Sequence, residues 1–299
     1  MREIRWAVLG TGVIANEMAA ALKKNGRNIS AVGNRTQEKA VAFAEKYGIE
    51  IVPMHVSMGD KVRADGTFPV DEICEYYDTT GKLPKTSGSS PEDFNKVFDS
   101  IHEKYPEKHI LYLAYSSSTT VSYASANIAA EGRDYITMLD TKHVSVGQYA
   151  VVTTVAEMLE KNQDITVDEA LAYAEKVCKK TRMCFVPNDL EYLKAGGRVS
   201  NVVFISGRLL KIHPRIEILD GKLIATKKHR GNLSKIAPQL VYDYAEENKL
   251  NRDKLWLIWA IGTTDAVKKA AYDAAVDCGF KEIEWVKTGC VITCHGGPG

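Results

Sequence analysis

The chain has 299 residues, a size typical of two domains, and 45% of its residues are hydrophobic. Its 39 basic and 38 acidic residues leave a formal net charge of +1, so charge gives no reason to expect nucleic acid or an anionic membrane as a partner. No apolar stretch approaches the length of a membrane span, and the N-terminus does not resemble a signal peptide. We therefore expect a cytoplasmic protein whose six cysteines are reduced thiols.

The first half of the chain alternates between short apolar runs, typical of strands, and longer runs with helical spacing. The expected strands are 4–9, 29–33, 51–56, 110–115 and 135–139. The expected helices are 13–24, 37–47, 71–78, 91–104, 122–130, 147–161 and 167–180. This alternation predicts an α/β domain with a mainly parallel sheet.

From Met183 onward, short strands are mixed with helices. Strands are expected at 184–186, 215–219, 222–225 and 256–261, and helices at 189–194, 233–248 and 266–278. Asp220-Gly221 lies between two strand-like runs and predicts a two-residue hairpin turn. We expect an α/β protein of two domains, 1–163 and 164–299, the second a smaller α/β (α+β) domain.

The first strand runs into a glycine motif, Gly10-x-Gly12-x-x-Ala15, which is typical of dinucleotide-binding units. Small residues there allow a tight turn and a close approach of pyrophosphate to backbone N–H groups. Arg35 follows the second strand where an acidic residue would bind the ribose of NAD, so NADP would be favoured. Residues 1–49, a Rossmann-like βα unit, resemble the start of the Gfo/Idh/MocA oxidoreductase family.

That oxidoreductase family next carries a Glu-Lys-Pro motif, but this chain contains no Lys-Pro dipeptide. We therefore interpret the βα unit as a packing element rather than a redox site. A Cys290-x-x-x-Cys294-His295 cluster near the C-terminus lacks the second ligand pair of a zinc site, so no metal is expected.

Four later segments carry the stronger signal. Residues 83–91 and 115–123 place several hydroxyls in loops before helices, while 188–200 and 294–299 are rich in glycine. Hydroxyls and N–H groups at a helix N-terminus suit a carboxylate or phosphate. Helix capping is the alternative, but capping requires one hydroxyl at each site, and residues 116–120 are all serine or threonine.

Together these segments resemble the DegV family of fatty-acid-binding proteins, from about residue 51 to 299. The resemblance includes residues 140–142, 207–214, 220–222 and 229–231. It implies two α/β domains that hold a long acyl chain in an apolar tunnel, with the carboxylate near the interdomain surface. It also implies a bacterial acyl carrier that presents the carboxylate to a fatty acid kinase and does no chemistry of its own.

The resemblance also implies which residues surround the carboxylate. Thr86 and the hydroxyls of residues 116–120 would hold the carboxylate, and Ser87 would support the first loop. Arg198 and His295 would lie nearby as charge partners. The predicted site residues are Thr86, Ser87, Ser117, Thr120, Arg198 and His295. A buried carboxylate needs several donors or a cation to offset its desolvation, so the set is physically reasonable.

Fatty acid is thus the expected ligand, and no cofactor is expected to be required. The alternative is an NAD(P)-dependent oxidoreductase of the Gfo/Idh/MocA kind that binds NADP through Gly10, Gly12, Ala15 and Arg35. A third interpretation is a sensor in which residues 10–15 bind a phosphate and the acyl site is a second input. A change in NADPH fluorescence on mixing is expected only from the second and third interpretations.

Overall fold

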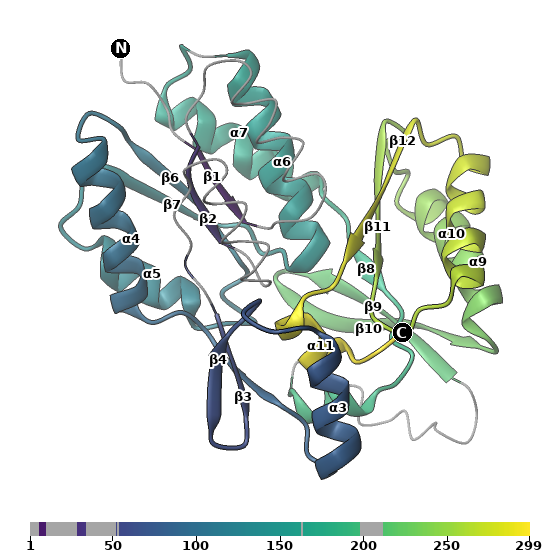
Figure 1. Cartoon of the computed structure of the whole chain (residues 1–299). Helices are drawn as coiled ribbons and strands as arrows, with labels where there is room; N and C mark the ends of the chain where they lie inside the picture. The colour runs from purple at the N-terminus through teal and green to yellow at the C-terminus, as the bar shows by residue number, and fades with distance from the viewer. Residues whose placement is uncertain (1–5, 10–28, 34–51, 53, 163, 198–211) are drawn as a thin grey trace. The chain divides into compact units, whose positions relative to one another are not determined.

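A computed structural model describes residues 6–9, 29–33, 52, 54–162, 164–197 and 212–299 (Figure 1). The chain forms two compact units, each built from separate stretches of sequence. Unit 1 comprises Met1–Pro69, Pro84–Thr181 and Gly289–Val291, and unit 2 comprises Val70–Leu83, Arg182–Thr288 and Ile292–Gly299. The predicted α/β class is confirmed, and the domain boundary at 163/164 stays a prediction.

Parallel strand pairs form the centre of unit 1. Strand β1 (Trp6–Leu9) pairs with β2 (Ile29–Gly33), and β6 (Ile110–Ala114) pairs with β7 (Ile136–Asp140). Strand β1 also lies beside β6. All five side chains of β6 are buried, as expected for a strand of a parallel sheet that is covered by helices.

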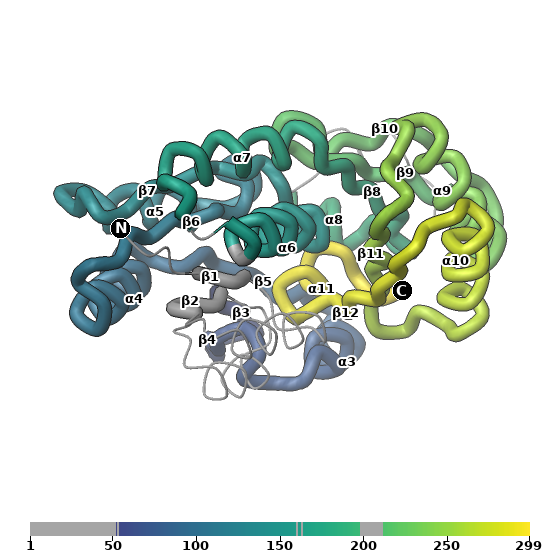
Figure 2. Tube along the Cα trace, turned by 90° about the horizontal axis from the view of Figure 1, so that it is seen from above, coloured from purple at the N-terminus to yellow at the C-terminus, as the bar shows by residue number. Residues whose placement is uncertain are grey.

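Two pairs of helices pack on these strands. Helix α4 (Pro91–Lys104) lies against α5 (Ser122–Ala130), and α6 (Ser145–Lys161) lies against α7 (Val167–Lys180) (Figure 2). The helices contact β1, β2 and β7. The predicted bounds of α4, α5 and α7 are those of the structure, and α6 begins two residues earlier than predicted.

Helix α4 shows why these local predictions succeed. The hydroxyl of Ser90 accepts from the backbone N–H of Asp93, whose carboxylate accepts from the backbone N–H of Ser90, and Pro91 stands at the first helical position. The buried side chains recur at helical spacing and form one face: Phe94, Val97, Phe98 and Ile101. The cap and the apolar face both depend on residues close together in sequence.

A small antiparallel sheet also belongs to unit 1. Strand β3 (His55–Met58) lies between β4 (Lys61–Ala64) and β5 (Lys85–Ser87). The strand predicted at 51–56 lies further along the chain in the structure, and neither β4 nor β5 was predicted. Both are short, and β5 pairs with a strand about thirty residues away, so no local pattern marks it.

Unit 2 contains an antiparallel and a parallel sheet. Strand β9 (Ile212–Leu219) pairs antiparallel with β8 (Cys184–Phe185) and β10 (Lys222–Arg230). Strands β11 (Lys254–Trp259) and β12 (Glu282–Lys287) pair in parallel. Strand β12 was not predicted, although its alternation of polar and apolar residues is typical of a half-buried strand.

The predicted hairpin turn at Asp220-Gly221 is confirmed. The two residues join β9 to β10 with φ angles of 48° and 79°, the left-handed conformation that a tight hairpin turn needs. Asparagine, aspartate and glycine adopt this conformation more readily than other residues, so the dipeptide itself identifies the turn.

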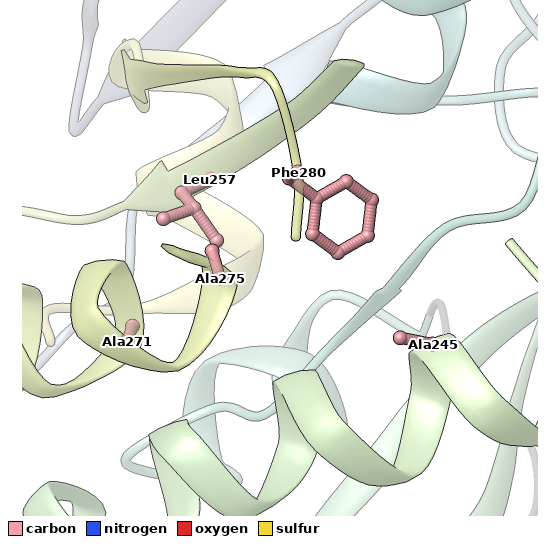
Figure 3. Packing of buried hydrophobic residues seen from close by; sticks show 5 residues of the cluster. All are labelled: Ala245, Leu257, Ala271, Ala275 and Phe280. Atoms are coloured by element: carbon pink, nitrogen blue, oxygen red, sulfur yellow. The ribbon is translucent and has the colours of Figure 1, made fainter. Parts of the chain in front are cut away.

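Helices of unit 2 include α3 (Asp71–Thr80), α8 (Glu191–Ala195), α9 (Leu233–Glu247) and α10 (Asp265–Asp277). Helices α9 and α10 lie side by side in both views (Figures 1 and 2). Their small residues pack with β11 and with the segment after α10 in one core cluster, shown in Figure 3: Ala245, Leu257, Ala271, Ala275 and Phe280. Alanines on facing helices allow this close packing.

A last helix, α11 (Cys290–Gly296), runs into the C-terminal glycine-rich segment 294–299, and no helix was predicted there. Asp65 accepts hydrogen bonds from its first two backbone N–H groups and so completes its first turn. None of the described helices has the length and apolarity needed to cross a membrane.

Candidate functional site

The first hydroxyl loop of unit 1 begins in strand β5. Thr86 lies opposite Val56 of β3 and is half-buried, while Ser87 is exposed. The chain then passes through Gly88 to the cap of α4. Pairing with β3 therefore holds the backbone at Thr86 in place, although the strand has only three residues.

The second hydroxyl loop follows the buried strand β6. Ser116 is fully buried, and its backbone N–H donates to the carbonyl of His143 at 2.9 Å. The Ser117 hydroxyl donates to Asp140 Oδ2 at 2.5 Å, and the Ser117 N–H donates to Oδ1 of the same carboxylate at 3.3 Å. A hydroxyl has one proton, so Ser117 could donate to a ligand only by releasing Asp140. Its role as a ligand stays a prediction.

A buried polar network holds the base of this second loop. The hydroxyl of Thr141 lies within hydrogen-bond distance of two acceptors, the carbonyl of Ala114 at 2.7 Å and Gln148 Oε1, which share its single proton. Gln148 Nε2 in turn donates to the carbonyl of Leu113 at 2.7 Å. Lys142, directly after Thr141, has a positive φ of 56°. The network ties the end of β6 to the end of β7, which explains what residues 140–142 do in this fold.

The two hydroxyl loops meet, although the sequence separates them by about thirty residues. The backbone N–H of Ser89 donates to Ser122 Oγ at 3.2 Å, and Ser122 Oγ lies 3.0 Å from Thr120 Oγ1. A Cβ added at Gly88 would lie 2.7 Å from Ser122 Oγ and 3.0 Å from Thr120 Oγ1. Glycine is therefore required for this close approach. Thr120 is half-buried at the junction.

Three residues of this junction, Gly88, Ser89 and Ser122, are not among the predicted site residues, and Ser122 makes most of its contacts. Its position as the first residue of α5 made it look like part of the helix start. Only its contacts with the other loop distinguish it, and no local signal in the sequence could have indicated them. Val121 beside it has φ −77° and ψ −9°, an ordinary right-handed helical conformation.

Unit 2 contains the predicted charge partner His295, in helix α11. A Cβ added at Gly196, just after α8, would lie 2.4 Å from His295 Nδ1. A Cβ added at Gly297 would lie 2.8 Å from Tyr192 Cδ2. The two glycine-rich segments, 188–200 and 294–299, are therefore in contact within this unit, and their glycines make room for an imidazole and an aromatic ring.

Five predicted binding residues lie outside the described residues: Gly10, Gly12, Ala15, Arg35 and Arg198. Strand β1, which ends directly before Gly10, and strand β2, which ends two residues before Arg35, are described. They run in parallel with Leu9 opposite Gly33, so both strands end together. This is the strand arrangement that the dinucleotide motif requires, and the motif itself stays a prediction.

Buried thiols give no sign of reactive cysteine chemistry. Burial raises the pKa of Cys178 to about 11, and burial together with the Asp65 carboxylate raises the pKa of Cys290 to about 12. Both thiols are therefore neutral near pH 7, and the thiolate is the nucleophilic and metal-binding form. In the part of the chain that the structure describes, no group of three or more His, Cys, Asp or Glu side chains is arranged to hold a metal ion.

Comparison with known proteins agrees with the resemblance found in the sequence. The model of the DegV family, which is described as uncharacterised proteins, matches residues 39–299. A second model, the coenzyme F420-dependent NADP oxidoreductases, matches residues 5–62. The chain thus resembles an NADP oxidoreductase at its N-terminus. The matching family is a different one from the Gfo/Idh/MocA family that the sequence motifs resemble.

Among curated proteins, a fatty acid-binding protein of Thermotoga maritima is 30% identical over 88% of this chain and 92% of its own length. A DegV domain-containing protein of Deinococcus radiodurans is 24% identical over 91% of this chain and 96% of its own length. Among solved structures, a fatty-acid-binding DegV family protein of Thermus thermophilus has a TM-score of 0.77 at 27% identity, with 91% of this chain and 96% of that chain covered. The chain belongs to the DegV family.

Proposed function

We propose that this protein binds a long-chain fatty acid and that the hydroxyl loops of unit 1 hold its carboxylate. One observation carries the proposal: Thr120 and the loop 86–90, two predicted ligand segments, are in contact through Ser122 and Gly88. The names of its relatives support the ligand class, since the T. maritima and T. thermophilus proteins are both described as binding fatty acid.

The two ends of the ligand have different tasks in this proposal. Each CH₂ group removed from water contributes about 0.8 kcal/mol, so an acyl tail of some fifteen carbons supplies most of the affinity. A carboxylate accepts hydrogen bonds only, and bonds to a charged group contribute about 1.5 to 3 kcal/mol each. Because these bonds are stronger to a charged acceptor, the hydroxyls of Thr86 and Thr120 would favour a carboxylate over a neutral headgroup and would orient it.

The remaining ligand assignments are part of the same proposal. Ser87 supports the first loop, Ser117 adds a further hydroxyl, and Arg198 and His295 act as charge partners of the carboxylate. Each carries a donor or a positive charge, which is what a partly desolvated anion needs. Single substitutions at these positions, measured against the same fatty acid, separate the residues that bind from those that only shape the loops.

We further propose that the protein is an acyl carrier for a partner kinase. A carboxylate oxygen of the bound fatty acid would attack the γ-phosphorus of ATP held by the partner, and ADP would leave, so that an acyl phosphate forms. The carrier supplies the oriented carboxylate and no catalytic group. A neighbour with the same fold, at 16% identity and a TM-score of 0.74, is the fatty acid kinase B3 protein of Streptococcus pneumoniae loaded with linoleic acid.

Mass spectrometry of the purified protein, native and after organic extraction, tests the proposed ligand. One C14–C18 fatty acid per chain is the expected result. Purified protein that carries no lipid and does not take up added palmitate would overturn the proposal. Phosphoryl transfer from ATP to palmitate, assayed with a candidate kinase in the presence and absence of this protein, tests the carrier role separately.

A second candidate function is NADP binding by the N-terminal segment. The parallel pairing of β1 and β2, with Leu9 opposite Gly33, favours it, as does the match of residues 5–62 to NADP oxidoreductases. Titration of the protein into NADPH, followed by nicotinamide fluorescence, tests it. A saturable change that Gly10→Val abolishes supports cofactor binding, and no change at tens of micromolar protein excludes it.

A further inference from the structure

Ser122 lies at the centre of the contact between the two hydroxyl loops. Its side chain is 2% exposed at the start of α5. Its Oγ accepts from the backbone N–H of Ser89 at 3.2 Å and lies 3.0 Å from Thr120 Oγ1. Its own backbone N–H donates to Thr120 Oγ1 at 3.2 Å. The hydroxyl of Thr120 thus lies within hydrogen-bond distance of both the hydroxyl and the backbone N–H of Ser122.

These contacts restrict where the protons can lie. The hydrogen bond between Ser122 and Thr120 has two directions, and either hydroxyl can be the donor. If Thr120 donates to Ser122, its single proton is used and it offers a ligand only a lone pair. If Ser122 donates, the oxygen of Thr120 accepts from both the N–H and the hydroxyl of Ser122. The hydroxyl proton of Thr120 is then available to a ligand.

A bound carboxylate selects between the two directions. It has no proton to donate above its pKa, so it needs Thr120 as a donor. The required chain runs from the Ser89 N–H to the Ser122 hydroxyl, then to the Thr120 hydroxyl, then to the carboxylate. Each hydrogen bond in such a chain polarises the next, which strengthens the last one.

We propose that Ser122 is a positioning residue which makes Thr120 a hydrogen-bond donor to the carboxylate of the bound fatty acid. The inference rests on the proposed function and adds a residue that acts through Thr120. Gly88 completes the arrangement, because only a glycine lets the first loop come close enough for the Ser89 N–H to hold Ser122. The selectivity for a carboxylate therefore depends on both loops together.

Two variants test this role. Ser122→Ala removes the link, and Ser122→Cys keeps a side chain of similar size with a weaker donor. Ser125→Ala is the matched control, since Ser125 is 8% exposed on the same helix and is absent from the junction contacts. The ligands are palmitate and 1-hexadecanol, which have equally long tails and different headgroups.

The expected result is a loss of about five- to tenfold in palmitate affinity for Ser122→Ala, with less than a twofold change for 1-hexadecanol. Ser122→Cys should lie between this variant and the wild type, and Ser125→Ala should match the wild type. In a Thr120→Ala background, Ser122→Ala should cause no further loss, because its effect passes through Thr120.

A spectroscopic measurement gives an independent readout. The pKa of bound palmitate, followed by the carbon-13 shift of [1-¹³C]palmitate, should be higher in Ser122→Ala than in the wild type. Hydrogen bonds to the charged form lower a pKa, so a weaker donor allows it to rise.

Equal losses for palmitate and 1-hexadecanol, or an unchanged carboxyl pKa, would show that Ser122 only supports the fold. A wild-type protein that fails to bind palmitate at all would instead refute the proposed function, so the two failures are distinct.

Discussion

Removal of the Asp65 carboxylate should destabilise the protein strongly, because Asp65 caps a helix that begins 225 residues later in the sequence. The side chain is 0% exposed, and its two oxygens accept from the backbone N–H groups of Cys290 at 3.2 Å and Val291 at 3.3 Å. These are the first residues of α11. The Asp65→Ala variant would leave both N–H groups buried without this acceptor.

The size of the effect follows from these two bonds. A cap residue replaced by alanine costs about 1 kcal/mol, and a buried donor left unsatisfied costs about 1 to 3 kcal/mol. We therefore expect Asp65→Ala to lower the free energy of unfolding by about 2 to 4 kcal/mol. Asp65→Asn keeps one acceptor oxygen and should lose about half as much.

Guanidinium denaturation, followed by tryptophan fluorescence and circular dichroism, measures this change. The two signals are fitted separately, because a chain with two compact units need not unfold in one step. Asp60→Ala is the control, since Asp60 is an exposed residue of the same antiparallel hairpin and should change stability by less than about 0.5 kcal/mol. An Asp65→Ala protein as stable as the control would refute the reasoning.

Three further outcomes are expected. The double variant Thr86→Ala, Thr120→Ala should bind palmitate at least about tenfold more weakly with an unchanged circular dichroism spectrum. Unchanged affinity would show that the headgroup assignment is wrong. Gly88→Ala should lower the free energy of unfolding by about 1 to 3 kcal/mol and weaken palmitate binding, because the new Cβ would lie 2.7 Å from Ser122 Oγ. A variant with wild-type stability and affinity would contradict the close approach of the two loops. Burial and neighbouring cations lower the pKa of His229, so the unfolded chain binds this proton more readily, and stability should fall as the pH drops through about 6.5. His229→Gln should flatten that pH dependence, measured by denaturation at pH 7.5 and 5.5, and an identical slope would contradict it.

Part of the candidate site could be predicted from the sequence, and part could not. The two hydroxyl-rich loops were identified because several hydroxyls stood before a helix, more than capping requires. Their contact through Ser89 and Ser122 joins residues 33 positions apart, and it could not be predicted from either loop alone. The Ser117–Asp140 bond joins residues 23 positions apart, and it was missed for the same reason.

The sequence by itself determined the features that depend on neighbouring residues. The capping box from Ser90 to Asp93 and the Asp220-Gly221 turn follow from local hydrogen bonding and backbone preference, and the buried strand β6 follows from a continuous apolar run. Its motifs also determined the family. In each case the interacting groups are a few residues apart, so the pattern of residue types already encodes the structure.

Only the tertiary structure decided which distant groups meet. Strand β5 exists because three residues pair with β3, and α11 begins where Asp65, 225 residues before Cys290, accepts its first N–H. The junction of the hydroxyl loops likewise depends on an approach of Gly88 to Ser122, which are far apart in sequence. Such contacts depend on how whole elements pack and on the closure of long loops, and no window of sequence contains both partners.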